Sequence, residues 1–222
     1  MSAPRKLAAE GIGTALLLAI VVGSGIMGER LAGGNTAIAL LANSTATGAG
    51  LYVLILIFGP ISGAHFNPAV TLVAAVQSEL TPGVAAAFVV VQLAGAFAGV
   101  GVAHLMFDLP IYSLSTHLRT GVGQWLSEFV ATIGLVLAIL SCSKYRPNAV
   151  PLAVGAYIAS AYWFTASTSF ANPAVTLARA ATNTFVGIYP GNVLPFVVAQ
   201  ILAAGSAAFF FRWLSKDSSI RS

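Results

Sequence analysis

The sequence Phe66-Asn67-Pro68-Ala69-Val70-Thr71-Leu72 returns in the second half of the chain as Asn172-Pro173-Ala174-Val175-Thr176-Leu177, with Phe170 just ahead of it. Each copy opens with asparagine and proline. These favour a helix start, because asparagine can cap the first turn and proline leaves no unbonded N–H there. The apolar stretches at about residues 66–77 and 171–182 are shorter than the roughly 20 residues that a membrane span needs. We therefore expect two short helices that do not cross a bilayer.

The composition places these two stretches in a membrane protein. Of the 222 residues, 58% are hydrophobic and only 7% are charged, with ten basic and six acidic side chains. A soluble domain carries about 25% charged residues, so these charges are too few to cover a water-exposed surface. Soluble enzymes and nucleic-acid-binding proteins are excluded on this ground. The single cysteine, Cys142, excludes an internal disulfide and a cysteine metal cluster, and we expect no metal and no cofactor.

Six longer apolar segments are each long enough to cross a bilayer. They lie at about residues 7–28, 36–58, 83–107, 122–142, 150–168 and 192–213. The sequence therefore predicts an all-α membrane protein with six transmembrane helices and two re-entrant half-helices, in one domain that covers residues 1–222. Arg5 and Lys6 ahead of the first segment also fit the start of a signal peptide. That segment is long enough to span and belongs to the repeat described next, so we expect it to be retained.

The two halves of the chain match in order, with a first repeat at about residues 1–107 and a second at about 120–214. The Asn-Pro-Ala motifs are accompanied by two further pairs of matching segments, Glu10–Thr14 with Glu128–Thr132 and Gln92–Gly95 with Gln200–Gly205. Because each half has three spans, an odd number, the second half is inverted relative to the first. The half-helices then meet at mid-membrane, where irregular backbone must be buried or line a water-filled cavity. The repeat therefore predicts a pore.

Lysine and arginine set the expected orientation, because they gather on the cytoplasmic side of membrane proteins. With both termini in the cytoplasm, the inner side carries Arg5, Lys6, Lys144, Arg146, Arg212, Lys216 and Arg221, and the outer side carries Arg30, Arg119 and Arg179. We therefore expect a multi-pass protein of the cell membrane with both termini cytoplasmic.

Taken together, these motifs resemble the aquaporin and aquaglyceroporin (major intrinsic protein) family over the whole chain. The resemblance rests on Ser62–Ala69, on Asn172-Pro173-Ala174, and on Glu10 and Glu128 in corresponding places of the two halves. It implies an aquaporin fold and a homotetramer with one pore in each subunit. It also implies a passive channel for water and small neutral solutes, which is not an enzyme and binds no nucleic acid.

The same resemblance assigns roles to the paired residues. Asn67 and Asn172 would cap the half-helices and donate to passing solute, while the positive helix ends repel cations. Glu10 and Glu128 would accept hydrogen bonds from the re-entrant loops. Glu10 can also be read as an interfacial residue near Lys6, and either acid as the coupling group of a transporter. His65 is expected to line or support the cytoplasmic mouth.

The family's second constriction uses four positions. Counting from the motifs without gaps gives Thr47, Ser160, Ser169 and Val175. Family members usually carry arginine where this chain has Val175, and water-selective members add histidine and a bulky aromatic. Small hydroxylated side chains predict a wide constriction that passes glycerol-like polyols and neutral metalloids. A filter without arginine resembles a bacterial branch of the family associated with arsenic resistance.

Arg179 lies one helical turn beyond Val175 on the same face. It can reach into the outer vestibule, or it can anchor at the membrane interface. This leaves three alternative functions: a water-selective channel that Arg179 narrows, a coupled secondary transporter, or a structural protein with a closed pore.

Small residues at Gly95–Gly99 and Ala203–Ala207 predict two closely packed spans.

Overall fold

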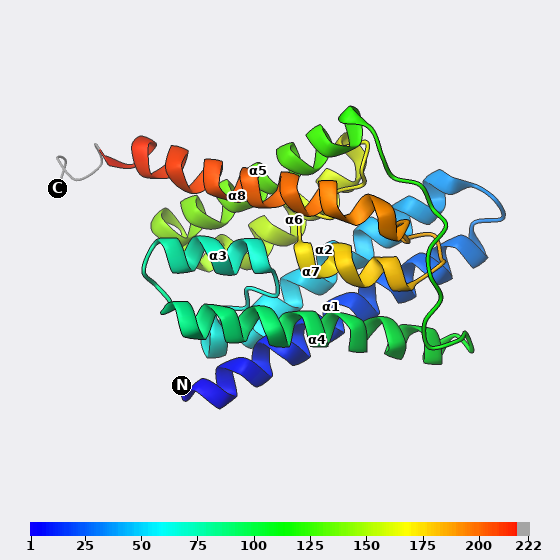
Figure 1. The fold of residues 1–222 in the computed structure, drawn as a ribbon, viewed down its shortest axis with the longest axis horizontal. Coiled ribbons are helices and arrows are strands. Elements are labelled where there is room, and N and C mark those ends of the chain that lie inside the picture. The colour runs from blue at the N-terminus through cyan, green and yellow to red at the C-terminus, as the bar shows by residue number, and fades with distance from the viewer. Residues whose placement is uncertain (217–222) are drawn as a thin grey trace.

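The computed structural model describes residues 1–216, and Arg221, one of the charges used above for orientation, lies outside the described residues. Its regular elements are helices, which Figure 1 shows as a bundle around two short inner helices. The first half holds α1 (Ala3–Leu31), α2 (Thr36–Ser62), α3 (Pro68–Val76) and α4 (Pro82–Met106). The second half holds α5 (Val122–Tyr145), η1 (Pro147–Ala149), α6 (Val150–Phe164), α7 (Pro173–Ala178), η2 (Arg179–Ala181), η3 (Pro190–Asn192) and α8 (Val193–Leu214).

Five of the helices are long and apolar enough to cross a membrane, namely α1, α2, α4, α5 and α8 extended by η3. The sixth predicted span is shorter than expected. Helix α6 has 15 residues, about 22 Å at the usual rise, and η1 precedes it. It ends at Phe164 because the chain leaves the helix at Thr165 to form the loop that leads back to α7. The predicted fold class is confirmed, with α6 as the shortest of the six long helices.

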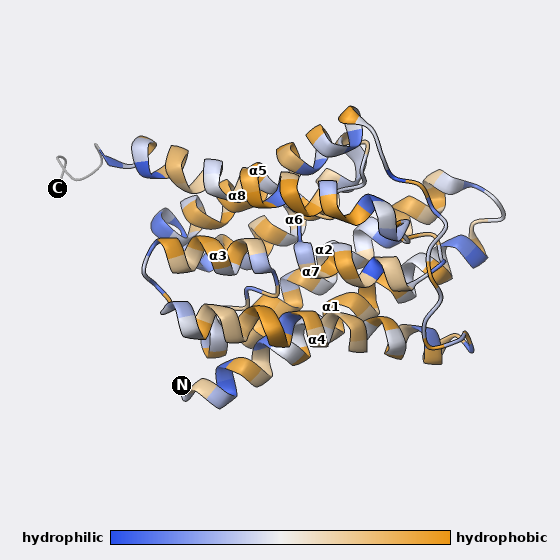
Figure 2. Ribbon diagram, in the orientation of Figure 1, coloured by the Kyte–Doolittle hydropathy of each residue, from blue (hydrophilic) through white to orange (hydrophobic). Residues whose placement is uncertain are grey.

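The two halves repeat one packing scheme. Helix α1 packs against α2 and α4, and α5 packs in the same way against α6 and α8, while α2 and α6 join the halves. The start of α1 and the end of α8 lie at one end of the molecule, which we call the terminal end (Figure 1). The connection between α4 and α5 crosses the opposite end, which we call the loop end. Figure 2 shows hydrophobic residues along the helices and hydrophilic residues mostly at these two ends.

The small residues of α4 allow a close helix contact. A Cβ atom at Gly95 would overlap the carbonyl oxygen of Gly11, and one at Gly99 would overlap the carbonyl oxygen of Ala15. The two glycine-containing stretches do not pack on each other, however. Helix α4 packs on α1, while Ala204 and Ala207 of α8 pack in a cluster with side chains of α5. The inverted repeat explains this, because each half pairs its first and last span.

Replacing Gly95 tests this contact. We expect Gly95→Ala to lower stability by about 1–3 kcal/mol, because an added methyl group must displace backbone of α1. Gly205→Ala is the matched control, since a Cβ atom there meets nothing within 4 Å. Thermal unfolding of the purified proteins in detergent measures both. Equal melting temperatures for the two variants would contradict the close α1–α4 contact.

Candidate functional site

The two half-helices start from asparagine side chains that cap them. The Oδ1 atom of Asn67 accepts a hydrogen bond from the Ala69 N–H at 2.9 Å. The Oδ1 atom of Asn172 accepts from the Ala174 N–H at 2.9 Å and from the Val175 N–H at 3.3 Å. Each proline occupies the first turn, where no partner for its nitrogen is required. Both short helices are therefore locally encoded.

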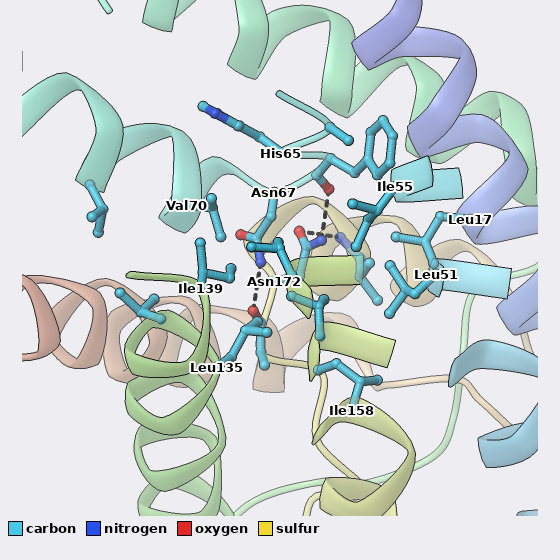
Figure 3. Close-up of a pocket in the computed structure, with 18 of the residues that line it drawn as sticks. Leu17, Leu51, Ile55, His65, Asn67, Val70, Leu135, Ile139, Ile158 and Asn172 are labelled. Atoms are coloured by element: carbon cyan, nitrogen blue, oxygen red, sulfur yellow. Dashed lines mark hydrogen bonds between the residues drawn. The ribbon is translucent and has the colours of Figure 1, made fainter. Parts of the chain in front are cut away.

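The same asparagines tie the two motifs together. The Nδ2 atom of Asn67 donates to the carbonyl oxygen of Ala171 at 2.8 Å, and Nδ2 of Asn172 donates to that of Phe66 at 2.8 Å. Figure 3 shows both amides at the centre of the cavity with these two bonds dashed. Each Nδ2 carries a second hydrogen, and both asparagines line the cavity. A passing water or hydroxyl can accept from them.

The loop ahead of each half-helix adopts a strained backbone. Phe66 and Ala171 precede the two asparagines with positive φ angles of 49° and 47°, and neither is glycine. A non-glycine residue in this region costs of order 1–3 kcal/mol. Such loops persist only where other contacts fix them. The backbone of both loops must therefore be held by other groups.

Two buried carboxylates provide those contacts. Glu10 accepts from the His65 N–H at 3.0 Å and from the Phe66 N–H at 2.7 Å. Glu128 accepts from the Phe170 N–H at 2.9 Å and from the Ala171 N–H at 2.8 Å. Both acids are fully buried, so the interfacial reading of Glu10 does not describe this structure. The matching bonds on the two loops reproduce the inverted repeat in atomic detail.

A glutamine from the last span of each half completes each cluster. Gln92 donates to Glu10 at 2.8 Å, and Gln200 donates to Glu128 at 2.6 Å. The same nitrogen atoms approach Thr71 and Thr176 of the half-helices at 2.9 and 2.8 Å. Each acid is thus linked to a loop, a half-helix and a membrane span.

A cavity of about 280 Å³ passes between the half-helices and the long helices. Much of its wall is apolar and comes from α1, α2, α5 and α6, as Figure 3 shows for Leu17, Leu51, Ile55, Leu135, Ile139 and Ile158. Polar side chains enter from the half-helix side, where Asn67 and Asn172 lie. Toward the terminal end, the lining includes His65, Gln77 and Glu79. A lining with an apolar wall and few polar groups suits neutral solutes that must shed part of their hydration.

Three of the four positions predicted for the second constriction line this cavity. Thr47, Ser169 and Val175 are buried side chains in its wall. The Ser169 hydroxyl is buried and has no hydrogen-bond partner in the described part of the chain. These positions lie toward the loop end, beside Arg179.

The fourth position, Ser160, was placed wrongly. Its side chain is exposed, and its hydroxyl donates to the carbonyl oxygen of Tyr157 in the same helix at 2.7 Å. Tyr162 lines the cavity instead, and its hydroxyl lies 3.3 Å from the Thr47 hydroxyl. The error arises because α6 ends at Phe164, so a count back from the second motif crosses an irregular loop. Two residues along a helix turn a side chain by about 200°, to the opposite face.

Arg179 lies at the cavity rather than at the lipid. Its side chain is 1% exposed, and its guanidinium carbon sits 3.3 Å from the centroid of the Phe170 ring. Nε donates to the carbonyl oxygen of Val186, while Nη1 has no partner within the described residues. The side chain lines the cavity, with Nη1 buried in its wall. The vestibule reading of Arg179 fits this geometry, although a loop carbonyl also holds it.

Two lining residues, Tyr162 and Phe170, and a neighbouring arginine outside the lining, Arg119, were not singled out from the sequence. Tyr162 was hidden by the error at Ser160, and Phe170 was noted only as part of the repeat. Arg119 belongs to the connection between α4 and α5, for which the repeat offers no counterpart. Burial lowers the pKa of its guanidinium, and Glu128 opposes that shift. An arginine remains charged nevertheless, because its ordinary pKa is so high.

His65 lies beside the first motif without forming a metal site. Its Nδ1 atom is 3.1 Å from the Thr71 hydroxyl, and its ring meets Phe88 edge-on at 5.7 Å between centroids. Among the described residues, no group of three or more histidine, cysteine, aspartate or glutamate side chains could hold a metal ion.

Comparison with known proteins gives the family. The sequence profile described as Major intrinsic protein matches residues 1–159. The chain belongs to the major intrinsic protein family. Its members are membrane channels, so the chain belongs to a channel family rather than to a family of enzymes.

Individual relatives agree with the family. The chain is 57% identical over 210 residues to "Aquaglyceroporin AqpS" of Rhizobium meliloti (strain 1021), covering 95% of this chain and 90% of that protein. It is 30% identical over 220 residues to "Probable aquaporin TIP2-2" of Oryza sativa subsp. japonica, covering 93% and 85%. The X-ray structure of the aquaglyceroporin from Plasmodium falciparum superimposes with a TM-score of 0.74 at 19% identity, covering 95% and 96%. This structural likeness supports the fold of the major intrinsic proteins.

Proposed function

We propose that this chain is a passive channel of the cell membrane for water and for small neutral solutes of the glycerol class. The observation that supports this most is the lining of the cavity toward the loop end. Val175 lies where other family members usually carry arginine, and Thr47, Tyr162 and Ser169 add three hydroxyl groups. A filter of this kind is wide enough for a polyol and replaces part of its hydration shell.

The contacts of Arg179 favour the polyol channel over a water-selective one. Its guanidinium group is stacked on Phe170 and bonded to Val186, so it lies against one side of the cavity. From that position it can donate a hydrogen bond to a solute hydroxyl without filling the passage. A neutral metalloid such as As(OH)3 has similar size and hydrogen-bonding groups, and we expect it to pass by the same route.

The coupled transporter is disfavoured by the contacts of the buried acids. The carboxylates of Glu10 and Glu128 accept backbone N–H groups of the re-entrant loops, together with Gln92 and Gln200. Their oxygen atoms are thereby used for structure. Carboxylates engaged in this way hold the pore open and are poorly placed to exchange protons with the solution.

We further propose that residues 1–222 form one channel domain of two inverted repeats, and that four copies assemble. Exposed apolar side chains on the long helices, among them Leu41, Leu56, Val90, Leu152 and Phe209, suit contact with lipid or with neighbouring subunits. In the proposed orientation both termini are cytoplasmic and the loop end faces outward. The excess of lysine and arginine at the terminal end supports it.

Stopped-flow light scattering on proteoliposomes tests the function. We expect rapid water flow after an impermeant osmotic shock and rapid glycerol entry, both well above the rates of protein-free vesicles. Glycerol flux rises linearly with its gradient and is unchanged when ionophores collapse proton and sodium gradients. Saturable, ion-dependent glycerol uptake would overturn the channel in favour of a coupled transporter. Absence of any flux from folded protein would favour a closed structural role.

Tyr162 and Ser160 form a matched pair that tests the corrected filter. Tyr162→Phe removes a hydroxyl from the cavity wall, at a cost of about 1 kcal/mol for one hydrogen bond to a partly dehydrated solute. We expect glycerol permeability to fall about five-fold, with a smaller effect on water. Ser160→Ala removes an exposed hydroxyl and leaves both permeabilities unchanged. The opposite result, a loss at Ser160 alone, would restore the position deduced from the sequence.

A further inference from the structure

A second arginine, Arg119, lies beside Arg179 at the loop end. It belongs to the connection between α4 and α5, which crosses that end of the molecule (Figure 1). Its Nε donates to the carbonyl oxygen of Gly187 at 2.8 Å, and its Nη1 donates to that of Ser167 at 3.3 Å. Its guanidinium carbon lies 5.2 Å from the centroid of the Phe170 ring. The side chain therefore reaches inward from the loop instead of extending into solvent.

Two guanidinium groups thus share one aromatic ring. The carbon of Arg179 lies 3.3 Å from the Phe170 centroid and that of Arg119 lies 5.2 Å from it. Both charges are therefore close enough to act on the same passing ion, since screening in salt extends over about 8 Å. The partners of both groups in the described chain are neutral oxygens, contributed by Ser167, Thr168, Phe185, Val186 and Gly187.

The balance of charge among these two arginines and the acid that acts on both is positive. Glu128 is the acid whose field reaches both arginines, and it carries one negative charge against their two. Its oxygen atoms are occupied by the Phe170 and Ala171 N–H groups and by Gln200, so it forms no contact with either guanidinium group. Removing Arg119 would leave one charge of each sign and cancel the excess.

Excess positive charge at a narrow entrance raises the energy of cations that approach it. Family members usually place this charge on the residue after the second Asn-Pro-Ala motif, where this chain has Val175. We propose that Arg119 is a specificity-determining residue of the channel, which together with Arg179 excludes cations at the loop end. The proposal rests on the proposed channel function. Arg119 in the loop and Arg179, one helical turn beyond Val175, then supply the positive charge that Val175 cannot carry.

The test is sodium uptake by proteoliposomes that contain a fluorescent sodium indicator, with water permeability measured on the same vesicles. We expect Arg119→Gln to raise sodium uptake at least ten-fold over the wild type. Arg119→Met, also uncharged, is made in parallel so that the test does not depend on one variant folding. Arg119→Lys keeps the charge but loses most of the hydrogen bonds, and we expect it to stay within about two-fold of the wild type.

Arg30 supplies the matched control. It lies at the same end and stacks its guanidinium carbon 5.1 Å from the Phe107 ring, with Nη2 donating to the Phe107 carbonyl oxygen. Its aromatic partner Phe107 is not part of the cavity lining, whereas Phe170, the partner of Arg119, is. Arg30→Gln should therefore exclude sodium as the wild type does. The proposal fails if water-conducting Arg119→Gln and Arg119→Met vesicles exclude sodium as the wild type does. It also fails if Arg119→Lys leaks as much as Arg119→Gln. A wild type that conducts neither water nor glycerol would refute the channel function instead.

Discussion

Val175→Arg is expected to reduce glycerol permeability by at least ten-fold while water permeability stays within a few-fold of the wild type. Val175 is 5% exposed and lines the cavity beside Thr47 and Ser169. A long guanidinium side chain at this point must project into the passage, because its base is enclosed by packed residues. The polyol is excluded by size, whereas a single file of water still passes and can accept hydrogen bonds from the new donor.

Val175→Thr is the control for this experiment. Threonine has nearly the same shape as valine and adds one more hydroxyl to the wall, so glycerol permeability should be retained. Stopped-flow measurements of water and glycerol on the same three preparations give the comparison. Glycerol flux through Val175→Arg equal to that of the wild type would mean that the constriction lies elsewhere.

Glu128→Ala is expected to abolish the folded, water-conducting protein. The change leaves the N–H groups of Phe170 and Ala171 without their acceptor, and removes the acceptor of Gln200. An orphaned buried donor costs about 1–3 kcal/mol, and these losses act together on a loop with strained backbone. The sum approaches the whole stability of a typical domain, about 5–15 kcal/mol.

Glu29→Ala is the matched control, since Glu29 lies on the exposed end of α1. Size-exclusion chromatography of the detergent-solubilised proteins measures the yield of folded material, and stopped-flow scattering measures its water permeability. We expect normal values for Glu29→Ala and little or no monodisperse protein for Glu128→Ala. Normal water flux through Glu128→Ala would show that the re-entrant loop does not depend on this carboxylate.

The residues that have an equivalent in both halves could be located from the sequence, because each pair occurs at matching places in the repeat. Glu10 and Glu128 each precede a half-helix motif by a long stretch of chain, and their equivalent places in the two halves favoured the role that the family resemblance implies. The structure brings each to the loop of its own half. The half-helices could also be predicted from the sequence, since asparagine followed by proline encodes a capped helix start locally.

The remaining features depend on geometry that no repeat encodes. Ser160 was chosen by counting through the loop after Phe164, where helical periodicity does not hold, and Tyr162 was missed for that reason. Arg119 sits in an irregular connection whose path is set by tertiary hydrogen bonds, such as that from its N–H to Asn192 at 3.1 Å. Its approach to Phe170 therefore has no signature in the spacing of residues along the chain.

The filter is expected to pass a polyol because Val175 stands where family members usually carry arginine. The most direct measurement is the reflection coefficient of glycerol for wild-type proteoliposomes, obtained from the initial volume change in matched glycerol and sucrose gradients. We expect a glycerol coefficient well below that of sucrose, with high water permeability. A glycerol coefficient equal to that of sucrose, with high water permeability, would contradict it and identify a water-selective channel narrowed by Arg179.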